Sequence, residues 1–444
     1  MIRNFFLNVF NWFRQGSKLL LTIYSSLNAF WKIMIRKYFP TVLNWFLPGF
    51  KIAPLIYSSL HALWMMLFCL LWLTHINICD GFDFMKKVID YRDLITKNIF
   101  DIRRATDINK KYLVINTSKN NQLLAGDNDN QINSVVVDRK KLCRVLNILD
   151  SNSYKICYVI CDIFFEDKDG VNDNNLQDVI TRLNHKNKII LPYSIGDGKE
   201  NYISFPFINA NFGLSQYRSS FLNTQYLKFT YIINDTIKQL PLKAYEDITG
   251  KEMKQRDFFG VKYYMIDSKW CLNTVIPEFR YTSDDLIPDE TYYELGFFTA
   301  DFIKNNQIVI IGDFEGIRDR HHSIINKVAG AMIILNAFEA LEQGDNLIGI
   351  SYLVILFLFF LVISYHTLYK GLTQRYWGKR KKPNMIIDFL HKWINYLLIL
   401  MISIVSMLFF HHYFHLFIIL GYFSFIEILF CLLNKGGKSK RTIE

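Results

Sequence analysis

Long apolar stretches at both ends of the chain predict membrane-spanning helices. Residues 53–79 form a stretch of 27 positions without a formal charge. At about 1.5 Å per residue, this is long enough to cross a hydrocarbon core of about 30 Å. Three further apolar stretches follow near the C-terminus, at 347–369, 389–410 and 413–433. The pattern therefore predicts one span, a large polar insert and then three spans.

Inside the polar insert, residues 80–345, short apolar runs alternate with amphipathic stretches. We expect strands at 112–115, 158–165, 188–191 and 307–311, and helices at 139–150, 176–183 and 327–341. A stalk helix at 84–100 and an insert of mixed strand character at 203–264 complete the prediction. Such alternation is typical of an α/β sheet with helices on its faces. The expected fold class is an α/β extracytoplasmic domain inserted between one N-terminal and three C-terminal transmembrane helices of a polytopic α-helical membrane protein.

The formal net charge of +11 belongs to the hydrophobic ends of the chain. Of 51 Lys+Arg and 40 Asp+Glu, residues 80–345 hold 33 and 37, a net −4, which leaves 18 and 3 on the flanks, a net +15. The basic clusters lie before the first span, in the loop 370–388 and in the tail 434–444. Short loops rich in Lys and Arg stay cytoplasmic. Four spans then place both termini in the cytoplasm and residues 80–345 outside, and no nucleic-acid partner is expected.

The basic N-terminal region, residues 1–50, contains a duplicated segment. Residues 9–31 and 42–64 are identical at 13 of 23 positions with an offset of 33. The second copy runs into the first span, whereas the apolar part of the first copy, residues 19–31, is only 13 residues long. An apolar run this short is typical of a helix that lies in the membrane interface. A basic extension that only enforces orientation is the alternative.

Four blocks follow one another through the insert. They are IFDIRRAT at 99–106, YKICYVICDIFFED at 154–167, DNNLQDVITRL at 173–183 and the block 307–341 that begins QIVIIGDFEG. In this order, and with one span before and three after, the blocks resemble the extracellular CHASE sensory domain of the second type, associated with bacterial cyclases and histidine kinases. The matched positions are Asp162, Phe165, Gly312, Asp319, Gly330 and Asn336-Ala337. The resemblance covers residues 84–433 and implies a ligand-sensing domain outside the membrane.

The chain departs from the family pattern at two places. Family members commonly carry Asp after their first strand, where this chain has Asn116, Thr117 and Ser118, and their Trp-Pro-rich segment corresponds here to residues 133–137. Family proteins also typically continue into a kinase or cyclase after the last span, whereas residues 434–444 follow it here. We therefore expect no enzyme activity, and expect output through the membrane helices to a separate cytoplasmic protein.

The candidate ligand-binding residues are Asp162, Gly312, Asp313 and Asp319. Asp162 and Gly312 end predicted strands, where open α/β sheets place ligand crevices. The alternatives are turn capping for Asp162 and a backbone requirement for Gly312. The loop holding Asp313, Glu315, Asp319, His321 and His322 is polar, but its spacing is not that of a metal site, and no metal or cofactor is expected.

Polar residues inside the predicted spans form a second set of candidates. A carboxylate within a span usually faces partners or water, so Glu427 either snorkels to the surface or pairs with Asn395. His411, His412 and His415 cluster on the predicted outer turn, as an interfacial belt or as a pH- or metal-sensitive site. A disulfide between Cys143 and Cys271 is an alternative to buried thiols.

The leading hypothesis is a non-enzymatic sensor in the bacterial inner membrane. Its outward domain would bind a small molecule or a protein and shift the packing of the later spans, with the bilayer and a cytoplasmic signalling protein as partners and a homo-oligomer as one possible state. A pore-forming or membrane-disrupting effector that uses the duplicated helices is a second hypothesis. A structural anchor in the cell envelope is the third.

Overall fold

The computed structural model describes residues 52–73, 108–124, 134–165, 171–195, 210–216, 229–258, 261–275, 281, 286, 292–316, 319–323, 326–368, 385–410, 412, 419–422 and 424. The chain divides into two units. One is formed by Met1–Met65 and Phe357–Asp388, and the other by Met66–Leu356 and Phe389–Glu444. The second unit contains the whole α/β domain.

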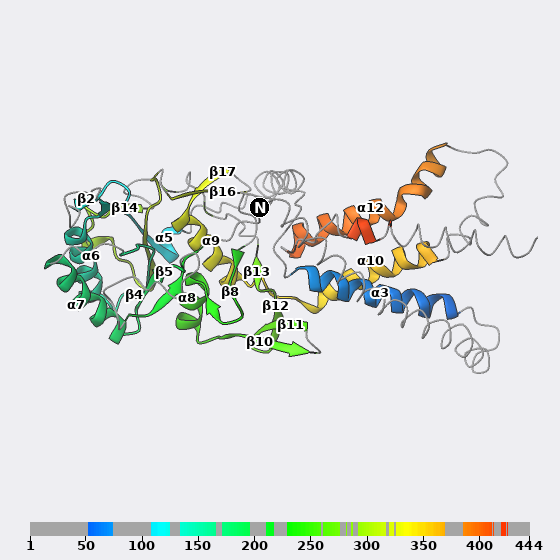
Figure 1. Ribbon diagram of the computed structural model, residues 1–444, viewed down its shortest axis with the longest axis horizontal. Helices are drawn as coiled ribbons and strands as arrows, with labels where there is room; N and C mark the ends of the chain where they lie inside the picture. Colours follow the sequence, from blue (N-terminus) through cyan, green and yellow to red (C-terminus); the bar gives the residue numbers. More distant parts are fainter. Residues whose placement is uncertain are drawn as a thin grey trace, which may run out of the picture. The chain divides into compact units, whose positions relative to one another are not determined.

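Six parallel strands form the central sheet of the α/β domain (Figure 1). They are β1 (Tyr112–Asn116), β4 (Ile156–Cys161), β5 (Ile189–Tyr193), β6 (Phe212–Leu214), β14 (Tyr292–Glu294) and β15 (Gln307–Gly312). Their order across the sheet is β14-β1-β15-β4-β5-β6, and every neighbouring pair is parallel. Parallel strands buried on both faces read as continuous apolar runs. The run YLVIN of β1 and the run QIVIIG of β15 are buried at every position.

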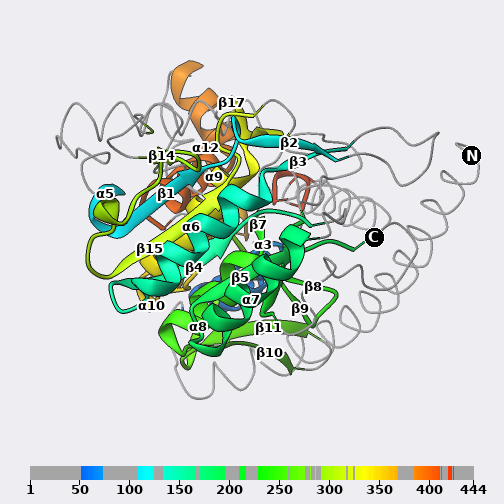
Figure 2. The same cartoon turned by 90° about the vertical axis from the view of Figure 1, so that its left-hand side faces the viewer.

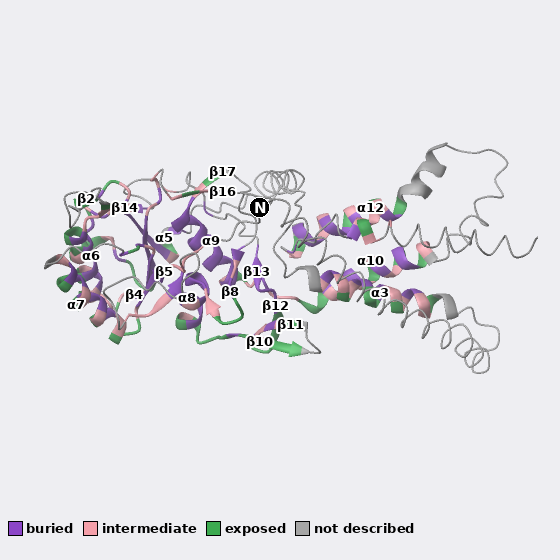
Figure 3. Ribbon diagram, in the orientation of Figure 1, coloured by how far each residue is buried: buried purple, intermediate pink, exposed green. Residues whose placement is uncertain are grey.

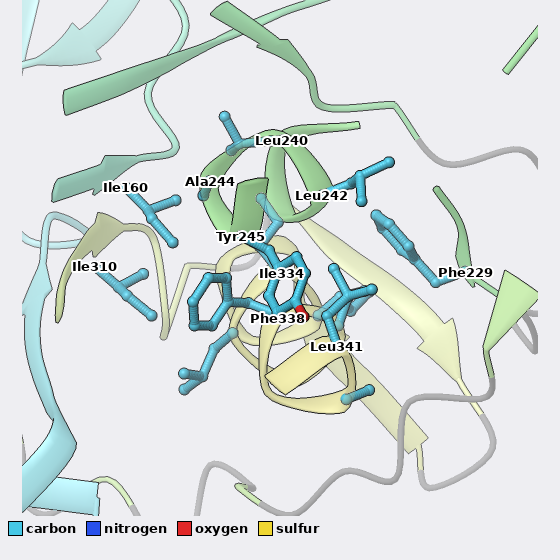
Figure 4. Packing of buried hydrophobic residues seen from close by; sticks show 14 of the residues in the cluster. Ile160, Phe229, Leu240, Leu242, Ala244, Tyr245, Ile310, Ile334, Phe338 and Leu341 are labelled. Carbon is cyan, nitrogen blue, oxygen red and sulfur yellow. The ribbon is translucent and has the colours of Figure 1, made fainter. Parts of the chain in front are cut away.

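Helices pack against both faces of this sheet (Figure 2). Helices α6 (Arg139–Ser151) and α7 (Val171–His185) bury their apolar sides against alternate strand residues such as Leu113 and Val309. Helices α8 (Leu240–Thr249) and α9 (Gly330–Gln343) pack on the other face, against the intervening residues such as Val114. Figure 4 shows α8 and α9 meeting Ile160 and Ile310 of the sheet, and Figure 3 shows the burial that results. The domain is therefore a three-layer α/β/α structure.

Local sequence fixes where these helices begin and end. The carboxylate of Asp138 accepts a hydrogen bond from the Lys141 amide at 3.0 Å and so caps the start of α6. Helices α8 and α9 both end at a glycine in the left-handed conformation, Gly250 at φ 70° and Gly344 at φ 73°. A side chain would strain the backbone there, so glycine is the residue that stops each helix.

Smaller elements surround the central sheet. An antiparallel sheet is formed by β10 (Met253–Phe258), β11 (Val261–Ile266) and β12 (Lys269–Cys271). Four antiparallel pairs are β2 (Asn121–Leu124) with β3 (Ser134–Val137), β7 (Phe229–Thr230) with β13 (Thr274–Val275), β8 (Ile232–Ile233) with β9 (Ile237–Lys238), and β16 (Arg320–Ser323) with β17 (Asn326–Ala329). The described part of the domain also contains a short α5 (Ile108–Lys111) and the 3-10 helix η4 (Ala300–Phe302).

Outside the α/β domain, the described residues include the long apolar helices α3 (Ile52–Leu73), α10 (Ile350–Leu368) and α12 (Met385–Phe410). Among the described residues, the stretch Ile350–Thr367 of α10 alone is long and apolar enough by length and composition to cross a membrane. The apolar stretches Leu55–Leu70 and Ile394–Met407 are shorter. A polytopic protein with four spans is therefore not supported. Among the predicted spans, in the part of the chain that the structure describes, only 347–369 corresponds to a helix of sufficient length and hydropathy.

Several sequence predictions fall outside the part of the chain that the structure describes. They concern the N-terminal region 1–50, the stalk helix 84–100, most of the loop 370–388, most of the predicted span 413–433, the tail 434–444, Glu427, His411 and His415. The first duplicated copy and its interfacial helix are among them. Of the cysteines that are described, Cys143 and Cys271 are both free, so no disulfide joins them.

Candidate functional site

The carboxyl edge of the central sheet contains a topological switch point at β15. Helix α9 follows β15 on one face of the sheet, whereas α6 follows β1 and α7 follows β4 on the opposite face. The neighbours of β15 in the sheet are β1 and β4. The chain leaves β1 and β4 toward one face of the sheet and leaves β15 toward the opposite face. Open α/β sheets place ligand crevices outside the carboxyl ends of strands at such a point.

Three positions form a row across this edge, Asn116 after β1, Gly312 at the end of β15 and Asp162 after β4. Asn116 and Gly312 are paired in register, and the Asp162 amide donates to the Ile311 carbonyl at 2.7 Å. Side chains alternate along each strand, so every second residue faces the same side of the sheet. The side that faces α8 and α9 contains residues 112 and 114 of β1, 308 and 310 of β15, and 158 and 160 of β4. Asn116, Gly312 and Asp162 come next in these series and therefore face α8 and α9 as well. Strands lie about 4.8 Å apart, so Asn116 and Asp162 are about 10 Å apart with the glycine between them.

Gly312 allows the first turn of α9 to approach the sheet. A Cβ placed on Gly312 would lie 2.7 Å from the Ala331 Cβ and 3.5 Å from the Asp162 Cβ. Any side chain here would push α9 away from β15. The backbone requirement considered for this position is therefore present, and it sets the width of the row between Asn116 and Asp162.

Asp162 is a half-buried carboxyl group with an acidic neighbour. Its Oδ1 accepts a hydrogen bond from the Ser215 hydroxyl at 3.0 Å, so the side chain joins β4 to the end of β6. Desolvation by the surrounding protein, followed by the charge of Asp319, raises the pKa of Asp162 to about 7. This carboxyl group therefore changes charge near neutral pH, and in its protonated form it donates a hydrogen bond.

Asp319 lies at the start of α9. The Gly330 amide donates to the Asp319 carbonyl at 3.0 Å, and a Cβ placed on Gly330 would overlap the Asp319 carboxylate. His321 Nε2 lies 2.9 Å from Asp319 Oδ1. The N-cap residue of α9, Ala329, makes no side-chain capping hydrogen bond. The carboxylate of Asp319 lies next to Gly330 at this N-terminus, where the helix dipole favours negative charge.

Asp313 organises its own loop rather than the row. Its Oδ1 accepts from the Gly316 amide at 2.5 Å, which closes a turn immediately after β15. Glu315, two residues on, accepts from the Tyr292 hydroxyl and lies 3.6 Å from the ammonium of Lys119. Of the four predicted ligand-binding residues, the structure thus brings Asp162, Gly312 and Asp319 together, and it gives Asp313 a role in the turn.

Asn116 was not among the predicted site residues. Its Oδ1 accepts from the amides of Phe314 at 3.1 Å and Ser118 at 3.2 Å, and its side chain is fully buried. Its Nδ2 has no hydrogen-bond partner among the described residues. A buried donor without a partner costs free energy and calls for an explanation such as a bound ligand. The available sequence signal was a polar residue directly after the apolar run 112–115.

The other candidates contribute less to a site. Within the described ranges, no group of three or more His, Cys, Asp or Glu side chains has an arrangement that could hold a metal ion. Asn395 is buried on α12, with 2% of its surface exposed, and its suggested partner Glu427 lies outside the described residues. His412 is buried, and its ring packs edge-on against Tyr352 with the ring centres 4.7 Å apart.

No protein family, no curated protein and no solved structure matches this chain. The resemblance to the CHASE sensory domain therefore stays a prediction. What the row at the carboxyl edge offers chemically is an unpaired amide donor, a carboxyl group that titrates near neutrality and the start of a buried helix.

Proposed function

We propose that this chain is a non-enzymatic membrane-bound sensor. In this proposal, the row formed by Asn116, Gly312 and Asp162 binds a small polar ligand, and α9 carries the effect of binding to α10. The observation that carries the proposal is the position of α9. Its first residue, Gly330, contacts Asp319 at the site, and α10 begins at Ile350, six residues after α9 ends at Gly344.

Helix α9 is suited to rigid transmission because it is buried along most of its length. Every residue from Gly330 to Leu341 is buried between the sheet, α8 and their loops. Packed interiors shift between discrete arrangements rather than deforming continuously. A displacement at the first turn therefore moves the helix as a body instead of being absorbed locally.

The far end of α9 is clamped to the start of β1. Glu339 has 4% of its surface exposed and accepts from the Tyr112 hydroxyl, from Lys111 Nζ at 2.6 Å and from Gln343 Nε2 at 2.9 Å. Glu342 forms a second ion pair with Lys111. This cluster couples the C-terminal end of α9 to the start of β1, next to the connection that leads to α10.

The role of α10 as the membrane helix rests on its exposed apolar surface. Only 28% of the stretch Ile350–Thr367 is buried inside the protein, whereas the core helix of a soluble domain would be mostly buried. Its side chains Val354, Leu358 and Val362 are each at least 50% exposed and recur every fourth residue. A continuous apolar stripe of this kind is typical of a surface that faces lipid or another apolar partner.

Polar contacts connect α10 with the other apolar helices. The Tyr352 hydroxyl lies 3.0 Å from Ser406 Oγ of α12, and the Tyr352 ring packs against Phe410 with centres 5.0 Å apart. His61 Nδ1 of α3 lies 2.8 Å from Ser364 Oγ. Helices in membranes associate through small polar residues of this type. In the proposal, movement of α10 changes these contacts, and a cytoplasmic partner reads the change.

The chemistry of the row limits the ligand. The ligand needs a hydrogen-bond acceptor for the Asn116 Nδ2 and, about 10 Å away, a donor or a cationic group for Asp162. Because Asp162 titrates near pH 7, such a ligand binds differently below and above neutrality.

Hydrogen exchange of the full-length protein in nanodiscs tests transmission without a known ligand. The variant Gly312→Ala displaces the first turn of α9, since the new Cβ meets Ala331. We expect faster amide exchange in residues 344–356 as well as at the site. Gly250→Ala is the matched control, because it strains the C-cap of α8, where a Cβ meets no atom within 4 Å.

Two outcomes would count against the proposal. If exchange in 344–356 is unchanged in Gly312→Ala, α9 does not transmit. If Gly250→Ala produces the same change, the effect is general destabilisation rather than transmission. Ligand binding itself is tested by screening small polar compounds for a thermal shift that is present in the wild type and lost in Asn116→Leu.

A further inference from the structure

The sheet β10-β11-β12 has one buried face and one exposed face. Met253, Tyr264, Ile266 and Cys271 turn inward and belong to the core beneath α8 and α9. In an antiparallel sheet, residues paired in register share a face, and alternate residues point to opposite faces. The pairs Arg256–Tyr263, Lys254–Met265 and Met265–Trp270 therefore define the opposite face.

This outer face combines basic and aromatic side chains. Lys254 and Arg256 are exposed, Tyr263 and Met265 are half-buried, and Trp270 has 50% of its surface exposed. The rings of Tyr263 and Trp270 lie 6.4 Å apart. Within β10, β11 and β12, no acidic residue shares this face. Glu252, the residue before β10, lies 3.2 Å from the Lys254 ammonium and 3.1 Å from the Lys238 ammonium. An ion pair as exposed as Lys254–Glu252 contributes at most about 1 kcal/mol.

The outer face is joined directly to the start of α10. The Leu272 amide donates to the Asn346 carbonyl at 2.8 Å, and the Ile348 amide donates to the Trp270 carbonyl at 2.8 Å. Residues 346–348 thus extend the sheet beside β12, and α10 begins two residues later at Ile350, which is 81% exposed. With about 3.3 Å per residue along the strand and about 4.8 Å between paired strands, Trp270 lies about 8 Å from the start of α10.

We infer that the outer face formed by Lys254, Arg256, Tyr263, Met265 and Trp270 lies on the phospholipid headgroups of the membrane that α10 enters. This inference rests on the proposed role of α10. The headgroup layer on each side of a bilayer is about 5 to 8 Å thick, which matches the distance from Trp270 to the helix start. Trp and Tyr favour this layer, and Lys and Arg bind anionic headgroups.

Photo-crosslinking of the full-length protein tests the inference. The protein is reconstituted in nanodiscs of phosphatidylcholine with or without phosphatidylglycerol, together with two photoreactive lipids. One carries a diazirine in its headgroup and the other at the end of an acyl chain. We expect headgroup adducts on the peptides containing Lys254–Trp270 and acyl-chain adducts on α10. Removing each basic residue, in Lys254→Gln and Arg256→Gln, lowers the headgroup adducts about fivefold in the anionic nanodiscs.

The control variant removes two cations of similar exposure on the α6 and α7 side of the domain, Arg182→Gln with Lys186→Gln. It is expected to leave the adducts on Lys254–Trp270 unchanged. Acyl-chain adducts on α10 without headgroup adducts on the outer face would overturn the inference and leave the proposed function intact. Absence of acyl-chain adducts on α10 would overturn both. Crosslinks from the outer face to a second copy of the chain in place of lipid would also overturn it.

Discussion

The two ends of α9 are built in opposite ways. At its C-terminal end, Glu339 is buried, and each of its oxygens accepts hydrogen bonds from partners that surround it. At its N-terminal end, the helix has no side-chain cap, Asp162 has a carboxylate as its neighbour, and Asn116 Nδ2 has no partner in the described part of the chain. Polar groups fully paired inside a protein stabilise one structure, whereas unpaired or like-charged groups persist where function needs them.

The pKa values show the same difference. Burial alone would raise the pKa of Glu339, but hydrogen bonds from Lys111 and Tyr112 bring it below the ordinary value of 4.5. No comparable donor set offsets the burial of Asp162, where the hydrogen bond from Ser215 is outweighed and the pKa rises to about 7. One carboxyl group is therefore held as an anion and the other as an acid, at opposite edges of one sheet. The groups that stabilise α9 therefore lie at the amino edge, and the groups of the proposed site lie at the carboxyl edge.

The largest expected effect is at the stable end. Glu339→Ala leaves Lys111 and the Tyr112 hydroxyl without their shared acceptor, so we expect a loss of about 3 to 5 kcal/mol in the free energy of unfolding of the domain. Native-state hydrogen exchange of α9 and β1 in the full-length protein measures this loss. Glu339→Gln keeps an acceptor and should lose less. Equal losses in the two variants would mean that the hydrogen bonds matter little compared with the charge.

Asp162→Asn tests the acidic end through its pH dependence. In the wild type, the folded protein keeps the proton of Asp162 up to about pH 7, whereas the unfolded chain releases it near the ordinary value of 3.8. Stability from this group is therefore full below about pH 4 and falls as the pH rises to 7, by up to about 4 kcal/mol at 1.36 kcal/mol per unit. Asn does not titrate, so the variant does not lose this stability. The Tm of the variant relative to that of the wild type should therefore increase as the pH rises from 4 to 8.

The dependence of stability on pH also distinguishes the carboxyl groups at the two ends of α9. The contribution of Glu339 has the opposite sign, because its lowered pKa gives stability that is lost only as the pH falls below 4.5. Parallel Tm curves for Asp162→Asn and the wild type from pH 4 to pH 8 would show that Asp162 is not held as an acid.

Gly312→Ala tests how closely α9 approaches the sheet. The added methyl would lie 2.7 Å from the Ala331 Cβ, and overpacking of this kind costs about 1 to 3 kcal/mol. The variant Ala331→Gly removes the opposing methyl, so the double variant should recover most of the loss after correction for the glycine itself. A double-mutant cycle by thermal unfolding gives the coupling. Strictly additive effects would mean that the two positions are not in contact.

Much of the central sheet could be predicted from the pattern of apolar residues. The predicted strands 112–115, 188–191 and 307–311 correspond to β1, β5 and β15, and the helices 139–150 and 176–183 correspond to α6 and α7. Long runs that are buried on both faces give a strong pattern. The predicted strand 158–165 was displaced, because β4 occupies Ile156–Cys161 and the apolar residues beyond it lie in the following loop.

The errors have physical reasons. Residues 327–329 continue the apolar pattern of α9, but they pair with β16 as β17, so the helix begins only at Gly330. Helix α8 was not predicted within the insert 203–264, although Pro241 and Gly250 mark its ends. It has only ten residues and lies between the strands β9 and β10, so its helical period covers a short part of the insert. The edge strand β14 is only three residues long, too short for periodicity to detect.

The site was predictable in part. Asp162 and Gly312 were identified because polar or glycine residues follow apolar strands, and register then places them side by side. Asn116 follows the same rule, since it comes directly after the apolar run 112–115. Ser215 follows a strand of three residues and is 53 residues from Asp162 in sequence, a pairing that only the folded chain shows.

The smallest effect expected is that of Ser215→Ala, which removes the hydrogen bond to Asp162 Oδ1. A single hydrogen bond of this kind contributes about 0.5 to 1.5 kcal/mol. Because the serine hydroxyl favours the charged form and lowers the pKa of Asp162, its loss should act mainly above pH 7. The pH window in which Tm falls should then extend to higher pH, while stability at pH 4 changes little. Ser215→Thr keeps the hydroxyl and serves as the control. An equal loss at pH 4 and pH 8 would show that the serine supports the β6 backbone and does not tune Asp162, and the acidic end of α9 would then resemble the stable end more closely than we infer.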